Sequence, residues 1–251
     1  MIERALGRVF DRVADAYDAA RPGYPDGLFE ALTELSGVRL PGALVVDVGA
    51  GTGISTRALL AHGARVVALD PGAGMLARLV ARTDDTGTAG AVLADGNALP
   101  LRDGVADLVC YAQSWHWLDP VASIAEARRV LRRTGRVAAW WNTHDTARAE
   151  WLAAYEARLA ELAPEYWGPA HPEWRVPSIA AVLDVEERWI PWTRLVGVEE
   201  FLLDLRSHSY MAALEPGRAD ELVGRQRELL REAATDGMLS VPVRVYLAVG
   251  A

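Results

Sequence analysis

The segment from residue 45 to residue 53, with the sequence VVDVGAGTG, decides the fold of this chain. Its first four residues have the pattern of a short buried strand, and its three alternating glycines open a turn into a helix. Doubly wound α/β folds bind nucleotides at such a turn, because glycine lets a ligand lie against bare main chain. Asp70 ends the next predicted strand, 21 residues after Gly49, where a carboxylate can bind both hydroxyls of a ribose.

Two features of this segment favour S-adenosylmethionine over a dinucleotide. The glycines are spaced Gly-x-Gly-x-Gly, and Ile54 stands where a pyrophosphate-binding loop has its third glycine. Asp47 lies two residues before the first glycine, where a carboxylate suits a ligand with an ammonium and a sulfonium better than a pyrophosphate. A nicotinamide-dependent oxidoreductase is the alternative, since it would share the fold and the use of Asp70.

Outward from this segment, short apolar strands alternate with helical stretches. Such alternation predicts an α/β fold with a parallel sheet and right-handed crossovers. The apolar patterns predict strands over residues 43–48, 65–69, 91–93, 106–111, 135–141, 188–195 and 239–249. They predict helices over residues 3–18, 26–36, 54–62, 73–82, 120–133, 146–162, 178–184, 197–213 and 217–234.

The composition excludes several classes of function. All 26 basic residues are arginine, which excludes phosphate-loop NTPases, pyridoxal Schiff-base enzymes and Tyr-x-x-x-Lys reductases, because each needs a lysine. A formal net charge of −8 without a basic stripe disfavours a nucleic-acid partner. The single cysteine, Cys110, excludes an internal disulfide, and the histidines lack metal-ligand spacing, so we expect no metal.

The chain also lacks signals for a membrane. No apolar run is long enough to span a bilayer, and the first 18 residues lack the apolar core of a secretory signal. We therefore expect a cytoplasmic protein without a membrane partner, acting on a small molecule. The sequence leaves the oligomeric state open.

Two polar segments follow the third and fourth predicted strands. Residues 94–100, ADGNALP, place Asp95 where its carboxylate can accept a hydrogen bond from an adenine amino group. Residues 113–119, QSWHWLD, follow the fourth strand, where we expect a methyl acceptor to lie. The carboxyl ends of parallel strands share one sheet edge, so both segments should lie near the glycine turn.

Taken together, these segments resemble the class I S-adenosylmethionine-dependent methyltransferases. In detail the chain is similar to the small-molecule branch that includes trans-aconitate methyltransferase-like enzymes, well over about residues 8–145 and loosely beyond. The resemblance implies methyl transfer from S-adenosylmethionine to a small-molecule acceptor, with S-adenosylhomocysteine as product. It implies an α/β, Rossmann-like doubly wound sheet of seven strands with the last strand antiparallel, plus N-terminal helices and C-terminal cover helices. One departure is Gly-Ala-Gly at residues 72–74, where relatives carry polar residues.

The resemblance also implies roles for individual residues. In the family the glycine turn lines the methionine part of the cofactor, the acid matching Asp70 binds ribose, and the residue matching Asp95 binds adenine. Members carry Tyr-x-x-x-Arg-Pro-x-Tyr-Pro before the sheet, matched here by residues 17–25, and by analogy Arg21 holds the cofactor's carboxylate. The predicted cofactor-binding residues are Tyr17, Arg21, Asp47, Gly49, Ala50, Gly51, Gly53, Asp70, Pro71, Asp95, Gly96, Asn97 and Gln113.

For the acceptor, the sequence offers hypotheses of lower specificity. His116 is a candidate general base, since a reference pKa of about 6.5 suits proton transfer at neutral pH; a packed ring without chemistry is the alternative. In-line displacement of the methyl group can also rely on alignment alone. Arg206, His208 and Tyr210 share a predicted helix that either contacts a polar or anionic acceptor or is a solvated face. The predicted substrate-binding residues are Trp115, Trp117, Trp141 and Tyr210, with simple packing as their alternative.

We interpret the chain as one domain over residues 1–251. Its core covers about residues 37–145 and 186–251, residues 1–36 form an N-terminal cover, and about residues 146–185 form an inserted helical cover. A methyltransferase-like protein that binds the cofactor without turnover fits the same sequence, because methyl transfer needs no obligatory catalytic side chain.

Overall fold

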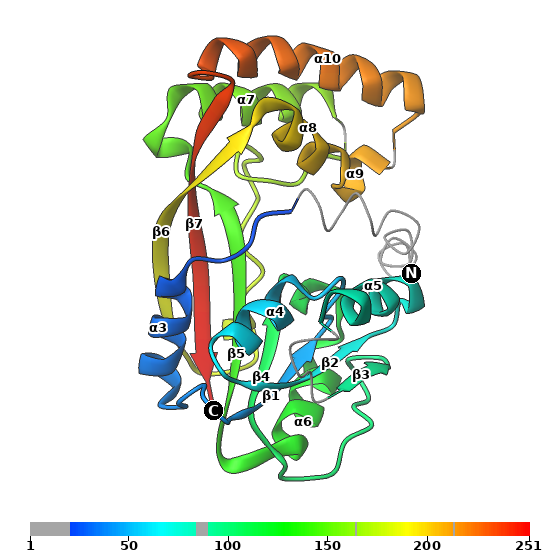
Figure 1. Ribbon diagram of the computed structural model, residues 1–251, viewed down its shortest axis with the longest axis vertical. Coiled ribbons are helices and arrows are strands. Elements are labelled where there is room, and N and C mark those ends of the chain that lie inside the picture. Colours follow the sequence, from blue (N-terminus) through cyan, green and yellow to red (C-terminus); the bar gives the residue numbers. More distant parts are fainter. Residues whose placement is uncertain (1–20, 84–89, 164, 213) are drawn as a thin grey trace.

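The computed structural model describes residues 21–83, 90–163, 165–212 and 214–251. The helix predicted over residues 3–18 and the candidate Tyr17 lie outside these residues. Within them the main element is a seven-stranded sheet with the strand order β3-β2-β1-β4-β5-β7-β6 (Figure 1). Its strands are β1 Leu44–Val48, β2 Arg65–Asp70, β3 Gly90–Leu93, β4 Ala106–Ala112, β5 Leu131–His144, β6 Val185–Gly197 and β7 Met238–Gly250.

The strand directions confirm the predicted fold class. Strands β1 to β5 pair in parallel, whereas β7 runs antiparallel to both β5 and β6. The strand order reverses between β1 and β4, and ligands of doubly wound sheets bind in the crevice at such a switch point. The glycine turn follows β1 directly, so the fold places it at this crevice.

The helices largely follow the sequence pattern. Gly37, with φ 68°, ends α3 in the left-handed conformation that glycine adopts without strain. The Asp119 carboxylate accepts hydrogen bonds from the amides of Val121 and Ala122, and Pro120 is the first residue of α6. The helices are α3 Asp26–Ser36, α4 Ile54–Ala61, α5 Ala73–Thr83, α6 Pro120–Val130, α7 Glu150–Leu162, α8 Val198–Arg206, α9 Ser209–Ala212 and α10 Pro216–Ala233.

Three predicted helices differ from those observed. The helix predicted to reach residue 133 ends at Val130, because Leu131 is extended and pairs with Ala106 of β4. The segment 178–184 contains only a 3-10 turn, Ile179–Ala181. The helix predicted over 197–213 is broken into α8 and α9, and the Ser207 hydroxyl donates to the Asp204 carbonyl at the break.

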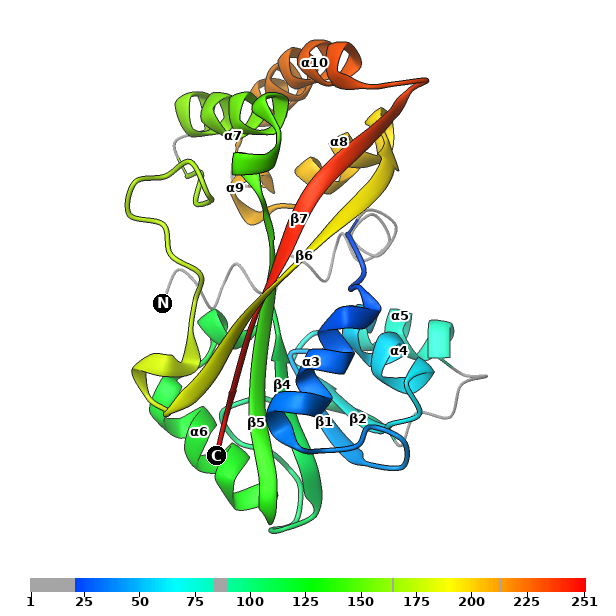
Figure 2. The same ribbon diagram turned by 90° about the vertical axis from the view of Figure 1, so that its left-hand side faces the viewer.

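Helices cover both faces of the sheet. One hydrophobic cluster joins α3 and α4 to one face, through Phe29, Leu59 and the fully buried Trp140. Another joins α6 to the opposite face, through Ile124 and the fully buried Tyr111. Figure 2 shows α3, α4 and α5 on one side of the strands and α6 on the other. The sheet is therefore buried as a doubly wound sheet requires.

A second lobe stands beyond the carboxyl edge of the sheet. Strands β5, β6 and β7 have 14, 13 and 13 residues and extend well past the shorter strands. Their far ends carry α7, α8, α9 and α10, which share a hydrophobic cluster of their own. We call this lobe, helices α7–α10 with the adjoining ends of β5–β7, the cover. It lies above the edge that bears the glycine turn (Figure 1).

Candidate active site

The glycine turn needs glycine at all three positions, for different reasons. The φ angles of Gly49, Gly51 and Gly53 are 71°, 57° and 87°, which side chains rarely adopt. A Cβ atom at Gly49 would lie 2.4 Å from Ser114 Cβ, and one at Gly53 would lie 2.8 Å from Leu79 Cγ. At Gly51 nothing lies within 4 Å of that position. Packing therefore explains two of the glycines, whereas Gly51 presents open main chain to a ligand.

Asp70 holds the turns after β1 and β2 together. Its Oδ2 accepts the Gly51 amide at 2.9 Å, and its Oδ1 accepts the Gly72 amide at 2.7 Å. Each carboxylate oxygen can accept more than one hydrogen bond, so the same side chain can also bind ribose hydroxyls. The partly exposed Asp70 and the exposed Pro71 lie at the edge as the sequence predicts.

Asp47 lies beneath the turn rather than on its surface. Its side chain is fully buried, and Oδ2 accepts the Thr56 hydroxyl at 2.7 Å. Cys110 Sγ lies 3.7 Å from Oδ1. Burial raises the pKa of Asp47 to about 6, against the lowering effect of the Thr56 hydrogen bond. In this arrangement the carboxylate supports the turn from below.

The segment after β3 contacts the segment after β4. Asp95 Oδ1 accepts the amide and the side-chain nitrogen of Asn97, at 2.9 and 2.8 Å. Asn97 Oδ1 in turn accepts the Asp119 amide at 2.9 Å. A Cβ atom at Gly96 would lie 2.6 Å from Val48 Cγ1 at the end of β1. Among the described residues, Oδ2 of the exposed Asp95 has no hydrogen bond, so it can accept one from an adenine.

Gln113 adopts a backbone conformation that is unusual for its residue type. Its φ is 56°, its amide donates to the Trp140 carbonyl at 2.9 Å, and its Nε2 donates to the Tyr24 hydroxyl at 3.2 Å. The next residue, Ser114, donates its hydroxyl to the Val48 carbonyl at 2.5 Å. The end of β4 is thereby tied to the glycine turn. Strained residues of this kind cluster at ligand sites, which supports a role for Gln113.

The candidate base His116 lies in a 3-10 turn, Trp115–Trp117. The residue as a whole is exposed, and its ring lies against Trp117, with ring centroids 4.6 Å apart. Dense protein around the ring lowers the pKa of His116 to about 4 by desolvation. Among the described residues no group hydrogen-bonds the ring. Trp115 is buried and packs edge-on against Tyr111, with ring centroids 5.1 Å apart. This contact agrees with simple packing, the alternative to substrate binding for this residue.

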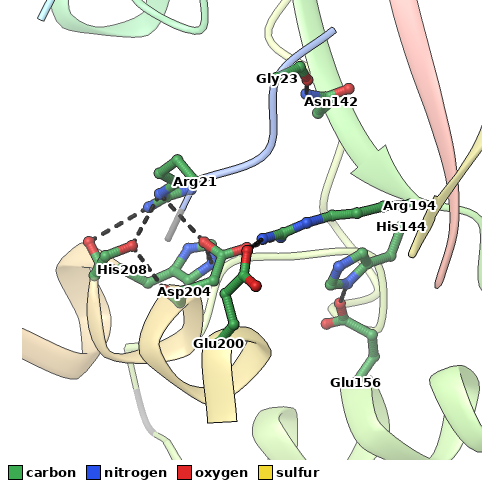
Figure 3. Close-up of polar contacts among 10 residues, drawn as sticks. Arg21, Gly23, Asn142, His144, Glu156, Arg194, Glu200, Asp204 and His208 are labelled. Atoms are coloured by element: carbon green, nitrogen blue, oxygen red, sulfur yellow. Dashed lines mark hydrogen bonds and ion pairs between the residues drawn. The ribbon is translucent and has the colours of Figure 1, made fainter. Parts of the chain in front are cut away.

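Arg21 contacts the cover. Its Nε donates to the Ser207 hydroxyl at 2.9 Å and lies 3.5 Å from Asp204 Oδ1 (Figure 3). The structure thus brings this predicted cofactor ligand to α8, whereas Asp70, Asp95 and Gln113 gather at the sheet edge.

Two predicted acceptor residues lie apart from each other. Trp141 is buried on the sheet, 6.1 Å from the ring of Tyr246, and its Nε1 has no acceptor in the described part of the chain. Tyr210 belongs to the cover, where its ring stacks on His208 at 5.1 Å. Trp117, partly exposed beside His116, remains near the sheet edge.

Sequence reasoning missed a polar network inside the cover. The buried Glu156 of α7 binds His144 Nδ1 through one oxygen and accepts the Tyr166 hydroxyl at 2.5 Å through the other. His144 ends β5, twelve residues before Glu156. The one sequence signal for this network is Glu156 itself, an acidic residue on the apolar face of α7. Apolar periodicity alone does not indicate which residue it contacts.

Comparison with known proteins places this geometry in a family. Residues 46–139 match the family model described as a methyltransferase domain. An uncharacterised methyltransferase of Mycobacterium tuberculosis is 32% identical over 227 residues, which are 90% of this chain and 87% of the relative. The chain therefore belongs to the class I S-adenosylmethionine-dependent methyltransferase family.

Solved structures agree on the fold. A type II methyltransferase from Anaeromyxobacter dehalogenans superposes with a TM-score of 0.70 at 23% identity, covering 92% of this chain and 96% of that one. A phosphoethanolamine N-methyltransferase from Haemonchus contortus, solved with phosphomonomethylethanolamine and S-adenosylhomocysteine, gives 0.53 at 16% identity, covering 96% and 57%.

Within the described residues, no three His, Cys, Asp or Glu side chains are grouped to hold a metal ion. No helix in the same part of the chain is long and apolar enough to cross a membrane.

Proposed function

We propose that this methyltransferase binds S-adenosylmethionine at the edge formed by the glycine turn and the ends of β2, β3 and β4. The bridge from Asp70 to the Gly51 amide carries the proposal, because it places a carboxylate beside open main chain. Gly51 would face the methionine part, Asp70 the ribose and Asp95 the adenine. When bound, S-adenosylmethionine supplies a methyl group on a sulfonium, ready for displacement. The family and the Haemonchus contortus complex support this choice of cofactor.

We further infer that the acceptor is a small molecule held between this edge and the cover. In the segment after β4, Gln113 bonds Trp140 of β5, and His116 and Trp117 follow in the turn that leads on to Asn97. Alignment of acceptor and methyl can supply most of the acceleration, so the proposal assigns no obligatory base. A net charge of −8 argues against a nucleic-acid acceptor.

The first test is a calorimetric titration of the purified chain with S-adenosylhomocysteine and, in parallel, with NADH. We expect micromolar binding of S-adenosylhomocysteine and no binding of NADH. Binding of NADH alone would contradict the proposal and favour an oxidoreductase. A panel of small acceptors with labelled cofactor then separates an active enzyme from a protein that binds the cofactor without turnover.

A further inference from the structure

The cover presents a cluster of histidine and tyrosine side chains that the proposed cofactor edge does not use. Three parts of the chain supply it: His144 ends β5, Tyr155 lies on α7, and His208 and Tyr210 lie at the break after α8 and in α9. The rings of His144 and Tyr155 are 6.1 Å apart, and His208 stacks on Tyr210 at 5.1 Å. In Figure 1, α8 and α9 lie on the side of the cover nearest α4 and α5.

Glu156 fixes the orientation of His144 within this cluster. Both carboxylate oxygens are occupied, one by His144 Nδ1 and the other by the Tyr166 hydroxyl. The His144 ring also stacks on Phe201, with centroids 5.6 Å apart. A histidine held through Nδ1 presents Nε2 as its second polar atom, and no described residue bonds that atom. The pair resembles the orienting contacts that hold functional histidines.

The charged groups around the cluster are paired with one another. Arg21 and Arg194 both contact Asp204, and Arg194 also contacts Glu200, at 3.3 Å (Figure 3). Burial lowers the pKa of His208, and the charge of Arg21 adds to this effect, so its ring is neutral at pH 7. The groups available to a ligand, the Tyr155 and Tyr210 hydroxyls and the His208 ring, are therefore neutral, whereas the Glu156 carboxylate is engaged by His144 and Tyr166.

Two hydroxyl groups in the cluster lack hydrogen-bond partners. Tyr155 as a residue is only 3% exposed and Tyr210 is half-buried, and among the described residues no hydrogen bond reaches either hydroxyl. Neither oxygen is among the fully buried atoms that lack a partner, so each hydroxyl stays accessible to a polar group of a ligand beside the aromatic faces. Aromatic walls favour a planar ligand ring.

We propose that this cluster is a subsite for an uncharged, hydroxylated planar ring at the far end of the acceptor. Tyr155, Tyr210 and His144 Nε2 would bind its hydroxyl group, and Glu156 is a positioning residue. His144 is four residues beyond Trp140, which bonds Gln113, so the subsite lies about 13 Å past the edge at about 3.3 Å per residue. The bound hydroxyl is therefore distinct from the methylated atom. The inference rests on the proposed methyltransferase function.

The test measures binding of three probes to the full chain saturated with S-adenosylhomocysteine, by saturation-transfer NMR. The probes are methyl 4-hydroxybenzoate, its charged analogue 4-hydroxybenzoate, and methyl benzoate, which lacks the hydroxyl. We expect the first to bind at least about tenfold more tightly than the others. Tyr155→Phe and Tyr210→Phe should each weaken the binding of methyl 4-hydroxybenzoate by about fivefold, which corresponds to the loss of one hydrogen bond. Tyr246→Phe, on the sheet, is the matched control and should not change the affinity for methyl 4-hydroxybenzoate.

Any other outcome of these binding measurements contradicts the proposed subsite. Tighter binding of 4-hydroxybenzoate would indicate an anion site, and equal binding of methyl benzoate would indicate apolar contact alone. Binding of no probe, or binding insensitive to both cover variants, would equally overturn the assignment. S-adenosylhomocysteine affinity is measured for every variant and should stay unchanged. Failure of the wild-type chain to bind S-adenosylhomocysteine would contradict the proposed function instead.

Discussion

Asp70 Oδ2 accepts the amide of Gly51 at 2.9 Å, so the residue that ends β2 holds the turn that follows β1. The other oxygen holds the Gly72 amide, which fixes the start of the helix after β2. One carboxylate thus sets the spacing of two adjacent turns at the cofactor edge. Under the proposed function, the same atoms would affect both the shape of this edge and its affinity for a ribose.

We expect Asp70→Asn to weaken S-adenosylhomocysteine binding by at least about tenfold, because an amide nitrogen would face one of the two backbone donors. The free energy of unfolding should fall by about 1–3 kcal/mol for the same reason. Calorimetry and urea denaturation measure the two effects. Glu161→Gln, an exposed acid on α7, is the control. Unchanged affinity in Asp70→Asn would show that this carboxylate does not contact the ligand.

Substitutions of two glycines should separate ligand contact from packing. At Gly51 an alanine meets no atom within 4 Å, so we expect a loss of stability of only about 1 kcal/mol from the positive φ, together with loss of cofactor binding. At Gly53 the new Cβ would lie 2.8 Å from Leu79 Cγ, so stability should fall further. Denaturation and calorimetry on both variants give the comparison. Equal losses of stability in the two variants would contradict the assignment of Gly51 to ligand contact and of Gly53 to packing.

Asp47 should make stability depend on pH in an unusual direction. Its folded pKa of about 6 exceeds the ordinary value of 3.8, so between these values the folded chain binds more protons than the unfolded chain. The contribution of this group is fully present below the lower pKa and is lost as pH rises through about 6, by about 3 kcal/mol. In Asp47→Asn this pH dependence should disappear. Urea denaturation at several pH values between 4 and 7.5 measures the difference between the two proteins.

His116 should stay neutral throughout the physiological range. Its pKa of about 4 lies below the reference value of 6.5, so the unfolded chain binds the extra proton between these values, and stability should rise with pH there. We expect the His116 NMR signals not to titrate between pH 5.5 and 8, with His116→Gln used for assignment. Methyl transfer should show no inflection near pH 6.5 from this residue. A signal that titrates near 6.5 would restore His116 as a general base.

The contact of Arg21 with Asp204 should stabilise the cover. Both side chains are largely buried, and removing one partner leaves the other uncompensated, so Arg21→Ala should lower stability by about 1–3 kcal/mol. Arg194→Ala, at the second oxygen of Asp204, provides a matched comparison. A simultaneous loss of S-adenosylhomocysteine affinity in Arg21→Ala alone would show that this guanidinium also reaches the cofactor. Unchanged stability would contradict the structural role.

Much of the fold follows from local sequence signals. The turn after β1 needs positive φ at three glycines, and the cap of α6 needs Asp119 before Pro120, so short-range chemistry specifies both. Leu131 fits the apolar pattern of the helix predicted over residues 120–133, but it pairs with β4 as part of β5. Sheet pairing therefore decides the structure at this residue. The break after Arg206 depends on Ser207, whose hydroxyl bonds the Asp204 carbonyl and also accepts from Arg21.

The candidate site was predictable where it follows strand ends and not where it depends on packing between lobes. The position of Asp70 follows from its distance from the glycine turn along the chain, and that of Asp95 from its place after the third predicted strand. The contact of Glu156 with His144 joins a helix to a strand end, and nothing in the spacing of the two residues indicates that they meet. The burial of Asp47 likewise depends on Thr56 and Cys110, which come from two other elements.

The long strands β5, β6 and β7 have a mechanical consequence. They pass from the sheet into the cover as hydrogen-bonded ladders, with β6 and β7 paired continuously from Val185 with Gly250 to Gly197 with Met238. A flap on loops can swing freely, whereas this lobe can approach the sheet edge only if the ribbon twists or bends along its length. The stiffness of that ribbon should therefore set the rate at which an acceptor is enclosed and released.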